Sequence, residues 1–349
     1  MRLSIKLPLL LPAILICVLS LSVLYSTAPN QAVSQLKFLG VGLGVYLLIT
    51  TIGIGVIAKN AWAIFFFCLL INLIPVIFGP EVRGSRRWIY LGPFNFQTSE
   101  LLKFAFIIYL SKSLSKININ RVSLSLIFFL LGVVISIFLI FLEPDLGTAV
   151  VLLLIFGTLL IFSEIHLKRA LIMAFSALII IAPLWFILKD YQKERITSFL
   201  NPAKDTLGTG YNVSQAQIAI GSGGLLGKGF GMGSQSHLRF LPESHTDFIF
   251  ASFAEEWGIA FCFILLGLYG IIFLIIVKTA LSLKDMFGVF LCLGIASYFY
   301  WQCFINIGMN LGLLPVTGIP LPLMSSGGSS LVTSFAILGL VPTPKQINS

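Results

Sequence analysis

Leu241-Pro-Glu-Ser-His-Thr-Asp-Phe-Ile-Phe250 is the stretch where a long polar segment ends and a long apolar segment begins. His245 and Asp247 therefore lie where a polar loop meets the apolar phase of a membrane. Downstream, Glu255 and Glu256 interrupt a run that is otherwise apolar enough to cross a bilayer. Ionisable groups at such depths are costly, so these residues are candidates for a functional site.

The composition of the whole chain identifies a membrane protein. Of the 349 residues, 58% are hydrophobic and only 10% are charged, whereas a soluble domain has about 25% charged residues. The net charge of +9 would suggest nucleic acid as the partner of a soluble protein. Here the basic residues lie mostly between apolar runs, so we attribute them to membrane topology and expect no nucleic-acid partner.

Apolar runs of about 20 residues are long enough to cross a bilayer as helices. The chain therefore predicts an all-α polytopic membrane protein, a single domain over residues 1–349. It has about ten such runs, near residues 7–26, 38–58, 61–79, 98–112, 122–142, 146–163, 170–188, 248–277, 286–306 and 326–341.

The distribution of lysine and arginine predicts the orientation of these spans. Basic residues gather in alternate connections, for example at Lys112, Lys116 and Arg121, and such connections face the cytoplasm. Both termini are then cytoplasmic. The longest connection, about 189–247 between the seventh and eighth spans, is extracytoplasmic. Within it, the residues from Lys189 predict an amphipathic surface helix, and Tyr211–Ile220 has helical spacing.

Glu100 and Lys103 open the fourth apolar run and are three residues apart, so on a helix they share one face and can pair. Two interpretations are open. The carboxylate can be a helix-start residue favoured by the helix dipole, with a lysine that extends to the surface. Alternatively, the two residues form the wall of a polar cavity open to the outside.

Three more charged residues precede or join predicted spans. Arg86 and Arg87 stand beside Trp88 and either anchor the chain at the interface or hold a phosphate or pyrophosphate, which guanidinium binds through two hydrogen bonds. Asp145, in the turn Glu-Pro-Asp, either caps the next helix or faces an outer cavity.

The glycine-rich run around Lys228 does not match a nucleotide-binding P-loop, because Ser222 occupies the first glycine position and Gly229 follows the lysine. We interpret the run as a loop whose backbone packs closely or approaches a ligand. The chain has three histidines, and none makes the paired spacing typical of a metal site.

Four segments, in this order, resemble the SEDS family (shape, elongation, division and sporulation) of membrane proteins. They are Gly84–Lys103, Glu143–Ala149, Leu241–Phe250 and Asn306–Ser330. The likeness covers nearly the whole chain, with small departures at Thr98, where proline is usual, and at Ser326, where tyrosine is frequent. The short termini and the stretches that begin at Gly233 and Asn306 favour the RodA (elongation) branch over the FtsW (division) branch.

The resemblance implies a peptidoglycan glycosyltransferase that polymerises lipid II at the outer face of the bacterial cytoplasmic membrane during cell elongation. Implied partners are a class B penicillin-binding protein, which is the transpeptidase, and other membrane proteins of the elongation complex. It further implies that Asp247 is catalytic. The residues expected at the substrate are Arg86, Arg87, Glu100, Lys103, Asp145, Gln215, Lys228, His245 and Ser325.

The chemistry of this reaction limits what the site must contain. Lipid II is an α-linked donor and the product bond is β-1,4, so the transfer inverts the anomeric carbon. One base, Asp247, is enough, because pyrophosphate is already a good leaving group. Cations or a divalent ion (Mg²⁺ or Mn²⁺) at the pyrophosphate complete the expected site, and no organic cofactor is expected.

A flippase or other transporter of lipid-linked precursors is the main alternative function. A transporter would place ionisable residues near the middle of the membrane, on broken helices in inverted repeats. Here these residues cluster at the outer ends of predicted spans and no internal repeat is visible, which favours the enzyme. The FtsW branch, with the same chemistry, is the second alternative.

Overall fold

A computed structural model describes residues 7–80, 85–91, 94–166, 190–200, 205 and 208–342. The predicted span 170–188 lies outside the described residues. The chain forms two compact units, each built from segments distant in sequence. Unit 1 comprises Met1–Ile52, Glu194–Lys278 and Phe299–Leu340, and unit 2 comprises Gly53–Lys193, Thr279–Tyr298 and Val341–Ser349. The expected single domain over 1–349 stays a prediction.

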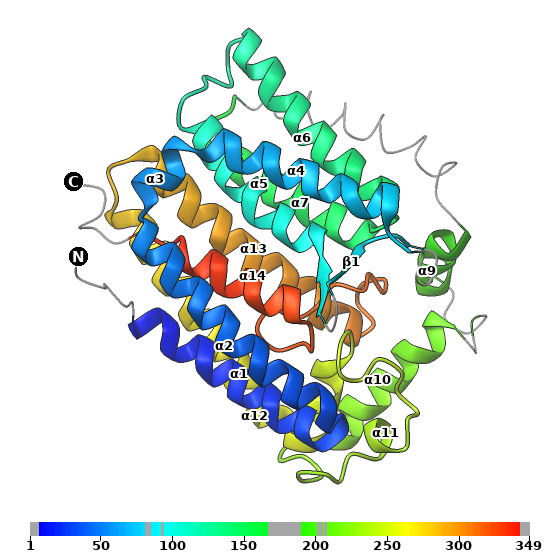
Figure 1. Cartoon of the computed structure of the whole chain (residues 1–349). Coiled ribbons are helices and arrows are strands. Elements are labelled where there is room, and N and C mark those ends of the chain that lie inside the picture. Colours follow the sequence, from blue (N-terminus) through cyan, green and yellow to red (C-terminus); the bar gives the residue numbers. More distant parts are fainter. Residues whose placement is uncertain are drawn as a thin grey trace. The chain divides into compact units, whose positions relative to one another are not determined.

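The described helices confirm the all-α membrane class (Figure 1). Six are long and apolar enough to cross a bilayer: α1 (Leu7–Thr27), α2 (Pro29–Ile52), α4 (Ala61–Phe78), α6 (Leu124–Leu142), α12 (Ile249–Ser282) and α13 (Met286–Asn310). Three shorter helices also match predicted spans: α5 (Thr98–Leu114), α7 (Leu146–Ile161) and α14 (Gly328–Gly339). The total of ten spans and the side of each terminus stay predictions.

Helix α2 differs from the predicted span 38–58. It begins at Pro29, only one residue after α1, and ends at Ile52. Proline is favoured at the first position of a helix, and hydropathy alone overlooks the polar first turns that follow it. Gly53 has a φ of 79°, a conformation that glycine adopts readily, and this break separates α2 from the short helix α3 (Ile54–Lys59).

In unit 1, α2 packs against both α1 and α14 (Figure 1). The contact with α14 is close at Gly42, where an added Cβ would lie 2.8 Å from the Phe335 ring. A second apolar core joins α10 (Thr209–Gly223) to the start of α12 and the end of α13. Phe248, next to Asp247, is buried in this core together with Ala219 and Met309, so the entry to α12 is fixed by packing.

The long connection predicted over 189–247 contains helices, as two patterns in the sequence indicated. Helix α9 (Asp190–Leu200) matches the predicted amphipathic segment, and α10 contains the predicted helical stretch. A third, short helix is α11 (Ser234–His237).

In unit 2, α5 packs against α4 and α7, and α6 packs against α7. A small hairpin precedes α5: strands β1 (Trp88–Leu91) and β2 (Phe94–Gln97) pair antiparallel, with Trp88 opposite Gln97. The all-α expectation did not include this hairpin. Strands of four residues are too short to show the alternation of polar and apolar residues by which a strand is recognised.

Candidate active site

Asp247 lies directly before α12 and is held by two amide side chains of α13. Asn306 Nδ2 and Asn310 Nδ2 donate hydrogen bonds to the carbonyl oxygen of Asp247, at 3.1 and 3.0 Å. Asn310 Oδ1 also accepts a hydrogen bond from the backbone N–H of Ala251, at 3.1 Å, in the first turn of α12. Both asparagines are fully buried, so the backbone that carries the Asp247 carboxylate is fixed from the far end of α13.

Ser325 fastens the residues just before Asp247. Its hydroxyl donates to the carbonyl oxygen of Thr246 at 2.7 Å and accepts from the N–H of Leu321 at 2.8 Å. The neighbouring N–H of Ser326 donates to the carbonyl oxygen of His245 at 2.9 Å. Ser325 is buried, so the contacts shown here position the loop, and its predicted contact with substrate stays a prediction.

The Asp247 carboxylate faces an arginine across a glycine. A Cβ added at Gly318 would lie 3.6 Å from both Asp247 Oδ2 and Arg195 Nη1. Gly318 has a φ of 71°, which disfavours any side chain there. Arg195, on α9, and Asp247 therefore both approach the backbone of Gly318, a residue without a side chain to stand between them. Both side chains are half-buried.

Arg195 and Asn310 were not identified as site residues from the sequence, and Asn306 was named only as the first residue of a family motif. The two asparagines carried one signal: polar amides four residues apart share one face of an otherwise apolar helix. Arg195 carried none that singled it out among the charges of α9.

Lys228 pairs with a carboxylate inside the α12 sequence. Its Nζ lies 2.8 Å from Glu255 Oε1. The same carboxylate accepts hydrogen bonds from the backbone N–H groups of Gln235 and Ser236, at 3.0 and 3.3 Å. Glu255 is fully buried and thus ties α11 to α12. The predicted contact of Lys228 with substrate is untested, and its visible role is to neutralise Glu255.

Glu256, the second carboxylate of this segment, is partnered as well. Its Oε1 accepts a hydrogen bond from the hydroxyl of Ser26 and lies 3.1 Å from His237 Nε2. Both costly carboxylates in the span are therefore compensated by side chains from α1, α11 and the glycine-rich loop, as buried charges require.

The glycine-rich loop supplies hydrogen bonds to the backbone of α12 where that helix is broken. Gly258 has φ 79° and ψ 175° inside the helix. The N–H groups of Lys228 and Gly229 donate to the carbonyl oxygens of Glu255 and Glu256, at 2.9 and 3.0 Å, and the N–H of Ile259 donates to Gly224. Side chains at positions 223 and 227 would collide with the α12 backbone. The predicted close packing of this loop is confirmed.

In unit 2, Glu100 and Lys103 form the ion pair that their spacing predicted. Lys103 Nζ lies 2.6 Å from Glu100 Oε1, and both side chains are inaccessible to solvent. Lys103 Nζ also lies 5.7 Å from the centre of the Tyr298 ring, a cation–π distance. A lysine that extends to the surface would be exposed. The interpretation of Lys103 as such a lysine is therefore wrong.

Arg87 and Asp145 form a second ion pair, at 3.3 Å. Asp145 also caps α7 by accepting hydrogen bonds from the N–H and hydroxyl of Thr148, at 3.2 and 3.0 Å. Burial alone would raise the pKa of Asp145, but Arg87 and the two bonds from Thr148 hold it below its usual value. Asp145 thus caps the helix and also pairs with the arginine. Arg86, by contrast, is exposed.

The predicted site residues divide between the two units. Unit 1 contains Asp247, His245, Ser325, Lys228 and Gln215, the last being half-buried on α10; unit 2 contains Arg86, Arg87, Glu100, Lys103 and Asp145. Within unit 1, Ser325 and His245 belong to the Asp247 loop, whereas Lys228 belongs to the Glu255 cluster. The described residues include no group of three or more His, Cys, Asp or Glu side chains suited to a metal ion.

This arrangement defines a polytopic membrane protein whose carboxylates stand at the N-terminal ends of helices, with cations beside them. A model of the cell cycle proteins FtsW, RodA and SpoVE matches residues 1–346. The chain therefore belongs to this family, which confirms the SEDS resemblance.

Named relatives and a solved structure agree with this assignment. The chain is 35% identical over 308 residues to peptidoglycan glycosyltransferase MrdB of Escherichia coli K12, covering 86% of this chain and 82% of that protein. It is 37% identical over 315 residues to the probable peptidoglycan glycosyltransferase FtsW of Saccharophagus degradans, covering 88% and 81%. A structure described as structural coordination of polymerization and crosslinking by a peptidoglycan synthase complex has a TM-score of 0.83 at 32% identity, over 97% of both chains.

Proposed function

We propose that this protein is a peptidoglycan glycosyltransferase that polymerises lipid II at the outer face of the bacterial cytoplasmic membrane during cell elongation. The observation that carries the proposal is the setting of Asp247. Its backbone is held by two buried asparagines, and its carboxylate points at a cation across a glycine. The names of two relatives, each matched over more than four fifths of its length, supply the reaction class.

Asp247 acts as the general base of an inverting transfer. It accepts the proton of the acceptor sugar's hydroxyl while that oxygen forms the new bond to the anomeric carbon. The bond from the anomeric carbon to the pyrophosphate oxygen breaks, and the lipid pyrophosphate leaves as an anion. A positioned general base contributes about 10²- to 10⁴-fold to the rate, which is the contribution assigned to Asp247.

Arg195 is the cation we assign to the leaving group. Guanidinium binds phosphate groups through two hydrogen bonds in a fixed geometry, and Arg195 is half-buried beside the base. Arg87 and Lys103 remain proposed substrate contacts, although each has a carboxylate partner. A divalent ion also remains a proposal, with oxygen ligands from the substrate pyrophosphate in addition to any from the protein.

The proposed partner is a class B penicillin-binding protein that crosslinks the new strands. Support comes from the structural relative described as a peptidoglycan synthase complex that coordinates polymerization and crosslinking. Assignment to the elongation branch rests on the stretches that begin at Gly233 and Asn306. Complementation distinguishes this branch from the FtsW branch. The gene should restore rod shape to an elongation-deficient strain and should not restore septation to a division-deficient strain.

The first prediction concerns Asp247→Asn, which keeps the shape of the side chain and removes its basicity. We expect the polymerisation of fluorescent lipid II by the purified protein, assayed with its transpeptidase, to fall by about 10²-fold or more. Asp285→Asn is the matched control. Asp285 is exposed and accepts a hydrogen bond from the N–H of Gly288 at 3.1 Å, and asparagine caps a helix equally well.

Two outcomes would contradict the proposal. If Asp247→Asn retains most of its activity, the carboxylate only orders the start of α12. If the purified protein moves lipid II across liposome membranes without forming glycan, it is a transporter instead.

A further inference from the structure

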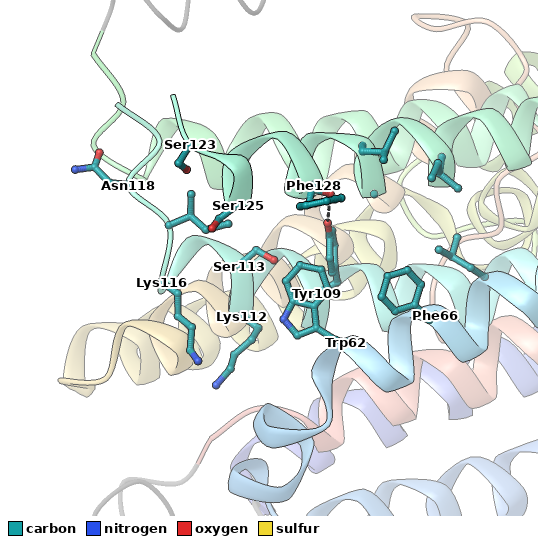
Figure 2. A pocket seen from close by; sticks show the side chains of 15 residues that line it. Trp62, Phe66, Tyr109, Lys112, Ser113, Lys116, Asn118, Ser123, Ser125 and Phe128 are labelled. Carbon is teal, nitrogen blue, oxygen red and sulfur yellow. Dashed lines mark hydrogen bonds between the residues drawn. The ribbon is translucent and has the colours of Figure 1, made fainter. Parts of the chain in front are cut away.

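Unit 2 contains a cavity of about 740 Å³ that has no part in the proposed reaction (Figure 2). It lies between α4, α5 and α6, at the end of α5 opposite the Glu100–Lys103 pair. Lys112 comes nine positions after Lys103 on this helix, which is about 14 Å along the helix axis. Its lining residues are Trp62, Phe66, Leu69, Tyr109, Lys112, Ser113, Lys116, Ile117, Asn118, Ser123, Ser125, Phe128, Leu131, Gly132 and Ile135.

One end of the cavity is an apolar wall that is held rigidly. Tyr109 stacks on Phe65 at 3.9 Å between ring centroids and meets Trp62 edge-on at 5.0 Å. Its hydroxyl donates to the carbonyl oxygen of Phe129 at 2.9 Å and lies 3.3 Å from that of Phe128, the contact drawn as a dashed line in Figure 2. Two other residues of the wall, Phe66 and Leu131, are 53% and 48% exposed. The apolar wall therefore continues onto the surface of the unit.

The other end of the cavity is cationic. Lys112 and Lys116 line this end with Ser113 and Ser125, and Figure 2 labels all four residues there. None of the lining residues is acidic. Elsewhere in the described chain, Lys103 and Lys228 each have a carboxylate partner. Lys112 Nζ instead lies 5.4 Å from the centre of the Phe287 ring.

Ser113 adds a second, independent sign that a ligand belongs here. Its side chain is only 2% exposed, and its hydroxyl has no hydrogen-bond partner within the described part of the chain. A buried polar group without a partner is destabilising. A ligand oxygen in the cavity would satisfy it.

We propose that this cavity binds one anionic phospholipid. Its phosphate lies between Lys112 and Lys116 and accepts a hydrogen bond from Ser113, and one acyl chain follows the wall of Phe66 and Leu131. The cavity volume falls within the range of about 300–1,000 Å³ that is typical of ligand pockets. Basic pockets between membrane helices bind the headgroups of anionic lipids in this way.

The two ends of the cavity together exclude simpler occupants. A water-soluble anion would leave the apolar wall without a partner, and a neutral lipid would leave two lysines without counter-charge. A lipid with a negatively charged headgroup matches both ends. The site is independent of the chemistry at Asp247.

The experiment is native mass spectrometry of the detergent-purified full-length protein, titrated with phosphatidylglycerol or phosphatidylcholine. We expect phosphatidylglycerol to bind more tightly. The double variant Lys112→Ala/Lys116→Ala should weaken its binding by about 10- to 30-fold, the effect of two lysines near a lipid phosphate. The matched control Lys278→Ala/Lys284→Ala removes two exposed lysines outside the cavity and should leave binding unchanged.

A second variant tests the apolar end and guards against misfolding of the first. Leu131→Trp fills the wall and keeps both lysines, so phosphatidylglycerol should bind less tightly although the charge at the other end of the cavity is unchanged. The melting temperature without ligand and the elution volume on size exclusion show whether each variant is folded. If the double lysine variant is not folded, the result for Leu131→Trp decides the test. The proposal is wrong if phosphatidylcholine binds equally well, if the control pair weakens binding equally, or if inorganic phosphate displaces the lipid.

Discussion

At the scale of single residues, Glu143 shows how burial changes the chemistry of a carboxyl group. It is fully buried at the end of α6 and accepts a hydrogen bond from the Thr98 hydroxyl at 3.3 Å. Burial, with a smaller contribution from Asp145, raises the pKa of Glu143 to about 9. At neutral pH it is therefore a neutral acid beside the ionised Asp145.

The second prediction follows from this raised pKa. Folding takes up a proton at Glu143 between its ordinary pKa of 4.5 and about 9. The stability that Glu143 contributes is thus complete below pH 4.5 and is lost as the pH rises toward 9. Glu143→Gln, which mimics the neutral acid, should flatten this alkaline loss when the free energy of unfolding is measured across pH. Glu164→Gln, the same replacement at an exposed glutamate, is the control for the effect of the substitution itself.

The third prediction separates stability from function at the Glu100–Lys103 pair. Removing one partner leaves a buried charge alone, which costs about 3–5 kcal/mol, whereas replacing both partners with apolar groups is often neutral. Glu100→Gln and Lys103→Met should each lower the melting temperature, and the double variant should recover it. Lys59→Met, at an exposed lysine, should have no effect.

Activity in the double variant then decides the role of the pair. If the pair faces substrate, polymerisation stays low although stability is restored. Full activity in the stable double variant would show that the pair is only structural. Unchanged stability in both single variants would contradict the buried ion pair itself.

At the scale of elements, the fourth prediction concerns the break in α12. Gly258 has a positive φ, and a Cβ there would collide with the backbone of the glycine-rich loop. Gly258→Ala should therefore lower the melting temperature and the yield of folded protein. Gly267, in the same helix, has no atom within 4 Å of an added Cβ, so Gly267→Ala should be neutral or stabilising by up to about 1 kcal/mol. Equal stability of the two variants would contradict the close packing at Gly258.

The elements also show what a sequence can and cannot reveal. Glu100 and Lys103 were predicted to pair because a three-residue spacing on a helix decides which side chains meet. The start of α2 was missed, since its first turns are polar and hydropathy detects only the apolar part. Arg195 approaches Asp247 through tertiary structure, across more than fifty positions of chain, and no local pattern encodes such an approach. The hairpin of β1 and β2 was missed because its strands are short.

At the scale of the whole molecule, the fifth prediction concerns orientation in the membrane. Residues 189–247 are predicted to be extracytoplasmic, and the connection that carries Lys284 is predicted to be cytoplasmic. Both Ser222 and Lys284 are exposed. A cysteine at Ser222 should react with a membrane-impermeant thiol reagent added to intact cells, and a cysteine at Lys284 should react only after lysis.

The unmodified protein is the background control, because its five cysteines are buried or half-buried. Labelling of the cysteine at Lys284 in intact cells, with protection at Ser222, would reverse the orientation. Such a result would also place Asp247 on the wrong side for a substrate displayed outside the cell.

The packing of α2 and the repair of α12 differ in when their partners are synthesised. Ribosomes add about 5–20 residues per second, so the loop at Gly229 leaves the ribosome a few seconds before the Gly258 backbone that it completes. Helix α2, by contrast, is synthesised long before its partner in α14. Phe335, which covers Gly42, is made almost three hundred residues later, so α2 must wait in the membrane without this partner until nearly the whole chain has been translated.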